Sequence, residues 1–253
     1  MRYQLIRTGV AVLVMSAAIA AQGQMDLGSL RKAGRMPSAS ASADVKVDAS
    51  ANLSQGDAAG GLKEALSRGV STAIASTGKP GGYSENPAIK ILMPPKLQRV
   101  EQGLRAVGMG SQVDAFVKSM NGAAEEAAPA ARAILMQALK RMTFSDARGV
   151  VTGGRTAGTE YFKRTTTTEI QAAFRPIVES AMAKTGVTQQ FTELMGKAPA
   201  IPLMKTPTID INQYVLDKST DGLFTVMAQE EVTIRTDPAA QVTPLLKSVF
   251  GKF

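Results

Sequence analysis

INQYVLDKSTDGLFTVMAQEEVTIR, residues 211–235, carries one long helical pattern. Asp210 stands directly before it and suits a helix start, and Asp237 followed by Pro238 interrupts the pattern at its end. Since a helix with an apolar face must bury that face against other elements, this stretch predicts a packed helical domain. The apolar residues that fall at helical spacings are Val215, Leu223, Val226, Met227 and Ile234.

Helical patterns also fill the chain on the N-terminal side of this stretch. They cover residues 54–77, 97–107, 113–120, 129–142 and 156–185, and glycines or prolines separate them. Pro129 suits a first helical turn. We expect Pro176 to kink the last of these helices, which the threonine run 165–168 could also interrupt.

Residues 88–93 are the best candidate for extended structure, but Pro87, Pro94 and Pro95 flank them and argue against a central strand. No alternating pattern of useful length occurs elsewhere. The predicted fold class is therefore all-α: a single irregular multi-helix bundle of about eight to ten helices, with no substantial sheet.

The N-terminus has the pattern of a cleavable export signal. Arg2 and Arg7 provide the positive charge, residues 8–20 are uncharged and apolar or small, and small residues follow at the expected cleavage point. The stretch is shorter than the roughly 20 residues that cross a bilayer as a helix. We therefore predict a signal peptide over residues 1–21 and no transmembrane anchor after cleavage.

Composition predicts two further segments and restricts the chemistry. Residues 22–52 are rich in Ser, Ala and Gly and are typical of a disordered linker, which leaves 53–253 as the helical domain. The sequence has no Cys and no His, which rules out a lipid-attachment cysteine, thiol catalysis and a serine–histidine triad. We predict no metal site and no cofactor. Lys and Arg number 29 against 21 Asp and Glu, but they are scattered, so specific nucleic-acid binding is not indicated.

A glycine-rich segment is the first candidate binding site. It comprises Thr152, Gly153, Gly154, Arg155 and Thr156. Amides at a helix start could bind an anion beside the arginine. The alternative is a Schellman-type helix end followed by a threonine cap. The Gly-Lys-Ser/Thr ending of a nucleotide-binding P-loop is missing.

Carboxylates give the second candidate. Glu230 falls on the apolar stripe of the 211–235 helix, so we expect it to be paired or protonated, with Arg175 as the partner in a structural ion pair. A catalytic acid is the alternative. Glu231 and Arg235 have the spacing of an ordinary surface pair. The adjacent Glu125 and Glu126 are predicted to lie on a solvated face.

Tyr161 is the remaining candidate. Lys163 and Arg164 follow it, which is the composition of a tyrosine–lysine proton relay, although no other feature of an oxidoreductase is present.

Several short motifs together resemble a known family. They are Leu53-Ser54-Gln55, Gly61 to Leu66, Met142 to Ala147, Thr152-Gly153-Gly154 with Thr156-Ala157, Tyr161-Phe162, Ala173 to Pro176, Asp221 to Phe224, Glu230-Glu231 to Ile234-Arg235, and Leu245 to Gly251. This set resembles an exported bacterial family known as domain of unknown function 4197. The resemblance implies a Gram-negative envelope protein with one helical domain, and it implies no activity, cofactor or catalytic residue.

These observations lead to three hypotheses for function. The first is a non-enzymatic periplasmic binding or scaffolding protein, whose partner is an envelope component such as a protein, a lipid or a cell-wall polymer. The second is a carrier of a small ligand or lipid in an apolar pocket between helices. The third is a carboxylate-based hydrolase centred on Glu230. The location expected is the periplasm, with secretion as the alternative.

Overall fold

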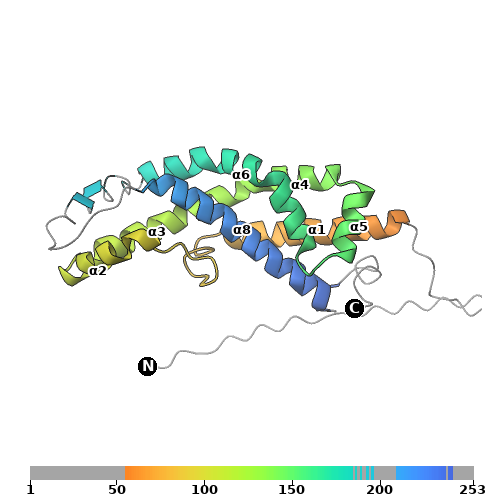
Figure 1. Cartoon of the computed structure of the whole chain (residues 1–253), viewed down its shortest axis with the longest axis horizontal. Coiled ribbons are helices and arrows are strands. Elements are labelled where there is room, and N and C mark those ends of the chain that lie inside the picture. The colour runs from red at the N-terminus through yellow and green to blue at the C-terminus, as the bar shows by residue number, and fades with distance from the viewer. Residues whose placement is uncertain are drawn as a thin grey trace, which may run out of the picture. The chain divides into compact units, whose positions relative to one another are not determined.

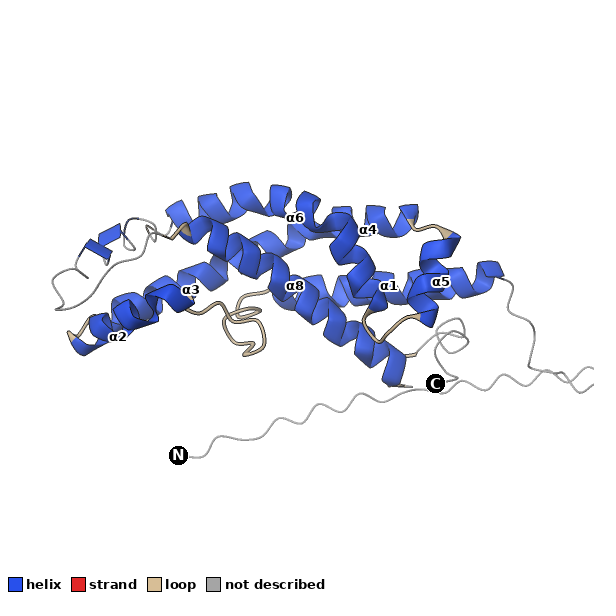
Figure 2. Cartoon of the chain, in the orientation of Figure 1, coloured by secondary structure: helices blue, strands red, loops and turns tan. Residues whose placement is uncertain are grey.

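All regular structure that the chain shows is helical (Figure 2). The computed structural model describes residues 55–184, 186, 189, 192–193, 195–196, 209–237 and 239–241. The predicted signal peptide over 1–21 and linker over 22–52 lie outside these residues. The all-α fold class is confirmed, whereas the count of eight to ten helices is not.

The helices follow the predicted patterns closely. In chain order they are α1 (Gln55–Thr77), the 3-10 turn η1 (Pro95–Leu97), α2 (Gln98–Ala106), α3 (Gly110–Ala127), the 3-10 turn η2 (Ala128–Ala130), α4 (Ala131–Arg141), α5 (Phe144–Thr152), α6 (Ala157–Lys184) and α8 (Ile211–Thr236).

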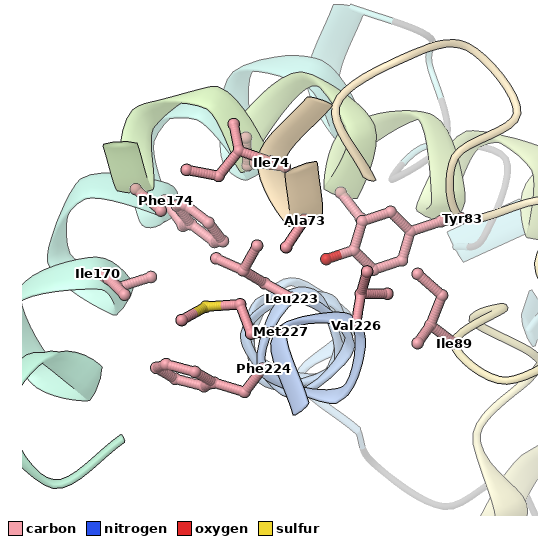
Figure 3. Packing of buried hydrophobic residues seen from close by; sticks show 14 of the residues in the cluster. Ala73, Ile74, Tyr83, Ile89, Ile170, Phe174, Leu223, Phe224, Val226 and Met227 are labelled. Atoms are coloured by element: carbon pink, nitrogen blue, oxygen red, sulfur yellow. The ribbon is translucent and has the colours of Figure 1, made fainter. Parts of the chain in front are cut away.

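The helix α8, which contains the stretch 211–235, lies at the centre of the packing. It packs against α6, α1 and α3, and Figure 1 shows it crossing in front of α1 and α3 with α6 alongside. Leu223 and Met227 of α8 are buried, and Figure 3 shows them facing Phe174 of α6. On the other side of α8, Tyr83 and Ile89 from the connection between α1 and α2 complete the core. Because α8 is covered on both sides, burial of its apolar surface is the main attraction holding the bundle together.

Local side-chain bonds fix the starts of two helices. Thr143 and Asp146 form a reciprocal capping box at α5, in which the Asp146 amide donates to the Thr143 hydroxyl over 3.1 Å. In return the Thr143 hydroxyl and amide donate to the Asp146 carboxylate over 2.6 and 3.0 Å, and these two bonds hold the pKa of the Asp146 carboxyl below its ordinary value. Asp210 caps α8 by accepting from the Gln213 amide over 2.9 Å, which confirms it as the helix start.

The long helix α6 is continuous through the threonine run and through Pro176, where the expected kink stays a prediction. Pro176 lies inside the helix. In the threonine run, the hydroxyls of Thr165, Thr166 and Thr167 each donate to the carbonyl four residues earlier, over 2.6–2.8 Å. These bonds satisfy the hydroxyls without taking the backbone out of the helix. The predicted interruption at 165–168 is therefore absent.

Candidate functional site

The start of α6 binds an anion, and that anion belongs to the chain itself. The first-turn amides of Gly158 and Thr159 donate to the Glu231 carboxylate over 2.9 and 2.7 Å, and the Thr159 hydroxyl donates over 2.9 Å. Unpaired amides and the helix dipole make a helix start a favourable place for negative charge. The glycine-rich segment thus leads into an anion site, as one reading of the sequence proposed, but α8 supplies the occupant.

The anion at this site is neutralised by a neighbour on its own helix. Arg235 donates to Glu231 from Nε and Nη2 over 3.1 and 2.8 Å, and its Nη2 also reaches the Val150 carbonyl of α5 over 2.9 Å. The side chains of Glu231 and Arg235 are only 7% and 11% exposed. The prediction of an ordinary surface pair is therefore wrong: this is a buried pair joining α5, α6 and α8.

Glu230 is not the buried carboxylate that the sequence pattern indicated. It is half-buried, facing the Gly69 side of α1, and partial burial raises the pKa of its carboxyl. Arg175, its predicted partner, is exposed and donates to Gln213 over 2.9 Å, with Glu179 at 4.0 Å. The predicted pair of Glu230 with Arg175 does not form.

The glycine-rich turn itself is exposed and irregular. Thr152, Gly153, Gly154 and Arg155 are all exposed, and Thr156 is half-buried. Gly153 has φ −83° and ψ −174°, so the left-handed residue of a Schellman end is absent and that prediction is wrong. Glycine is needed here for close approach, since a Cβ would lie 2.7 Å from the Gly149 carbonyl oxygen.

Tyr161 is a structural anchor between two helices. It is buried, and its hydroxyl donates to the Ala138 carbonyl of α4 over 3.1 Å. The Arg164 guanidinium lies 5.8 Å from the ring centroid, within range of a cation–π contact. Lys163 is exposed and pairs with Glu160 over 3.4 Å. Tyr161 and Lys163 therefore contact different groups and do not form the proposed tyrosine–lysine relay.

Two hollows lie around these residues. An open one of about 450 Å³ brings together Gly154, Thr156 and Tyr161, with Asp146 and Arg164 at its wall. The other is a cavity of about 20 Å³ between α1, α6 and α8 beside Glu231. The smaller volume accommodates about one water molecule. It offers no chamber for an acyl chain.

The connection between α1 and α2, residues 78–94, is held against the bundle by a second carboxylate. This is the long tan loop in Figure 2. Glu125 of α3 accepts hydrogen bonds from the amides of Gly81, Tyr83 and Ser84 over 3.0–3.1 Å. The solvated face predicted for Glu125 is therefore wrong. Glu126 is exposed and lies 3.6 Å from Lys184.

Asn121 of α3 fixes the middle of the same connection. Its carboxamide accepts from the Ile91 amide over 2.9 Å and donates to the Ile91 carbonyl over 2.8 Å. Both backbone groups of one residue can reach one carboxamide only if they lie on the same side, as in an extended chain. Asn121 is buried, and its carboxamide makes the two hydrogen bonds to Ile91 that a neighbouring strand would otherwise make.

Tyr83 ties the connection to α8. Its hydroxyl donates to the Ser219 carbonyl over 2.5 Å, and its ring lies against Gly222, where a Cβ would collide with it. Burial raises the pKa of this phenol far above its ordinary value. A second tyrosine, Tyr214, donates to the Leu92 carbonyl over 3.0 Å.

An open groove of about 520 Å³ runs between the extended part of this connection and α8. Lys90 and Leu92 line one wall, and Tyr214, Lys218 and Asp221 line the other. The Leu92 side chain is 58% exposed, a high value for a large apolar residue. Of the hollows described here, this groove combines the greatest volume with exposed apolar and cationic groups, so we take it as the candidate binding surface.

Comparison with family models gives one match, to proteins of unknown function, DUF4197, over residues 52–251. The chain belongs to the DUF4197 family. No curated protein and no solved structure matches it. The DUF4197 match covers the described helices α1 to α8 and both the Glu231 cap and the groove.

Sequence reasoning found some parts of this DUF4197 domain and missed others. It singled out the glycine-rich segment before α6, and Gly154, Thr156 and Tyr161 share one hollow. It missed Glu231, Glu125 and Asn121 as the side chains that hold loops and helix ends. The only signal for Glu231 was its spacing from Arg235, which exposed pairs share.

Two searches of the described residues complete the site. No helix among them is long and apolar enough to cross a membrane. Nor do these residues contain a group of three Asp or Glu side chains that could hold a metal ion.

Proposed function

We propose that this chain is an exported cell-envelope protein with a non-enzymatic binding or scaffolding role, and that the groove beside α8 is its binding surface. The observation that carries the proposal is how the buried polar side chains are used. One buried atom of the described part, Oδ1 of the half-buried Asn212, has no hydrogen-bond partner, but every polar residue that is buried as a whole makes a hydrogen bond within the fold. The residues are Thr77, Asn121, Thr159, Thr166, Ser219, Thr220, Glu231 and Gln241.

Such use of buried polar groups favours a scaffold over an enzyme. A catalytic acid or base must be free to reach a substrate proton, whereas Glu231 is closed in by Gly158, Thr159 and Arg235. Glu230 is half-buried, lies near Gly69 of α1, and is not among the residues that line the hollow beside the glycine-rich turn. The alternative of a lipid carrier is not supported, because the cavity between the helices has a volume of only about 20 Å³. The exposed groove is what remains for recognition.

Export is supported by the N-terminal pattern of residues 1–21 and by the known family to which the chain is similar. We expect the chain produced in a Gram-negative host to appear in the periplasmic fraction with residues 1–21 removed. Intact-mass measurement of the fractionated protein tests this expectation. Recovery of the full-length chain from the cytoplasm would contradict it.

Binding is tested by photo-crosslinking from the groove in intact cells. A benzophenone amino acid in place of Leu92 is expected to give an adduct with one envelope component, identified by mass spectrometry. Val107 and Phe144 provide matched controls, since their side chains are 60% and 49% exposed but do not line the groove. Absence of an adduct at Leu92, or equal adducts at all three positions, would contradict a binding role for the groove.

A further inference from the structure

The extended part of the connection has one open backbone edge. Asn121 occupies the edge formed by the amide and carbonyl of Ile91. On the opposite edge lie the carbonyl of Lys90 and the amide of Leu92, and neither makes a hydrogen bond within the described residues. Burial alternates along the same residues, with Ile89, Ile91 and Met93 buried and Lys90 and Leu92 exposed. Residues 90–92 therefore resemble a short strand whose outer edge has two groups, the Lys90 carbonyl and the Leu92 amide, unpaired within the described residues.

The free groups specify how a second strand would pair. In a parallel pair, one residue of the added strand lies opposite one residue of the first strand. Its amide donates to the carbonyl of the residue before that one, and its carbonyl accepts from the amide of the residue after it. Lys90 carbonyl and Leu92 amide flank Ile91 in that arrangement. Antiparallel pairing at Lys90 or Leu92 would need both backbone groups of one residue, but the Lys90 amide donates to Asn86 and the Leu92 carbonyl accepts from Tyr214. An antiparallel strand with Ile91 in a non-hydrogen-bonded pair uses the same two groups, so the free carbonyl and amide accept an added strand in either direction.

Charge around the groove specifies the side chains that such a strand would carry. Lys90, Lys163 and Lys218 line the groove against one acidic residue, Asp221. Among the ion pairs of the described residues, only Lys163 of these three takes part, with Glu160. Lys90 and Lys218 are exposed cations that form no ion pair within the described residues, although Lys90 lies near enough to Asp114 to lower the pKa of that carboxyl. They favour a ligand with carboxylates at positions that flank its backbone.

From these features we infer that the groove binds an extended, acidic peptide segment of another protein, which adds to residues 90–92 as a second strand. The backbone of the ligand pairs with the Lys90 carbonyl and the Leu92 amide, and its acidic side chains lie between Lys90 and Lys218. Its apolar side chains contact Leu92. Strand addition of this kind takes affinity from backbone hydrogen bonds and specificity from side-chain contacts. The inference rests on the proposed binding function and names its partner class.

A random heptapeptide display library, panned against the purified full chain, tests the chemistry of the ligand. Enriched peptides should be rich in Asp and Glu and in β-branched residues. As synthetic peptides they should bind at least about tenfold more weakly to the K90E/K218E variant than to the native chain, or about 1.4 kcal/mol. The control is K118E/K140E, which reverses the same number of exposed lysines outside the groove and should leave affinity unchanged.

The backbone pairing is tested separately by hydrogen exchange. The Leu92 amide should exchange rapidly in the free chain and be protected by a bound peptide. Carboxylates bound only to the lysines would leave this amide unprotected. Enrichment of basic peptides, no enrichment at all, equal weakening by both double variants, or an unprotected Leu92 amide would each overturn the inference.

The two proposals fail in different ways. If the Leu92 photo-crosslink forms an adduct but no acidic peptide binds, the groove has a partner and the inferred peptide class is wrong. If neither the adduct nor peptide binding is found, the binding function itself is wrong.

Discussion

Replacing Glu231 by Gln should destabilise the domain strongly, although the change preserves size and removes a single charge. Glu231 Oε1 accepts from the Gly158 amide and from Arg235, and Oε2 accepts from the amide and hydroxyl of Thr159. A Gln amide can present only one oxygen, so its NH₂ group would face donors. Arg235, 11% exposed, would also lose its counter-charge.

The magnitude follows from the burial of the pair. Removing one partner of a buried ion pair typically costs 3–5 kcal/mol, because the other charge stays buried and uncompensated. Arg235 keeps its bond to the Val150 carbonyl, which places the loss at the lower end, about 3 kcal/mol. For a domain of this size that corresponds to a fall in Tm of roughly 6–12 °C. Urea unfolding followed by far-UV circular dichroism measures it directly.

The adjacent residue provides the matched control. Glu230→Gln makes the same chemical change one position away on α8, at a half-buried site with no ion pair among those found in the described part. We expect a change within about 0.5 kcal/mol. Equal losses for the two variants, or a larger loss for Glu230→Gln, would refute the assignment of Glu231 as the helix cap.

Three further predictions use single substitutions. Gly158→Ala should lower the free energy of unfolding by about 1–3 kcal/mol, because its Cβ would lie 2.5 Å from Leu66 Cδ2. The control is Gly122→Ala, which has open space around its Cβ and should be neutral or stabilising by up to about 1 kcal/mol in urea unfolding. Asn121→Ala leaves both Ile91 backbone groups without their partner, so limited proteolysis should cut residues 78–94 faster, and an unchanged cleavage rate would contradict the proposed anchoring. The raised pKa of Glu230 means that this carboxyl holds a proton more tightly in the folded chain than in the unfolded chain. The stability of Glu230→Gln relative to the native chain should therefore increase as pH rises through the folded-state pKa, and the Tm difference should be larger at pH 7 than at pH 4.

The sequence was sufficient for the helices and for their ends. The apolar spacing in residues 211–235 predicted α8, and Asp210 predicted a helix start that its side-chain hydrogen bond confirms. These features depend on residues within about one turn of each other, so a local pattern contains them. The anchors of the connection 78–94 are different, because Glu125 and Asn121 lie 30 to 44 residues from the groups they bind. No local pattern predicts such a contact.

The error at Glu230 has a specific geometric cause. A count of 3.6 residues per turn from Leu223 reaches Glu230, which assumes that α8 buries a single stripe. In the fold α8 is covered by α6 on one side and by α1 and α3 on others, so Phe224 and Met227 define a second buried stripe that continues to Glu231. A helix buried on two sides therefore gives two equally valid counts, and the count alone cannot choose between adjacent carboxylates.

The choice between Glu230 and Glu231 also decides how the chemistry of this region is understood. The glycine-rich segment and a carboxylate of α8 were separate candidates for an anion site and for a catalytic acid. In the structure it is Glu231, the neighbour of the candidate acid Glu230, that binds the amides of Gly158 and Thr159 just beyond the glycine-rich segment, and Arg235 balances its charge. A buried polar network with its groups so paired makes a rigid junction of α5, α6 and α8. This junction therefore offers a ligand no unpaired carboxylate, whereas the groove proposed as the binding surface keeps the Lys90 carbonyl and the Leu92 amide unpaired within the described residues.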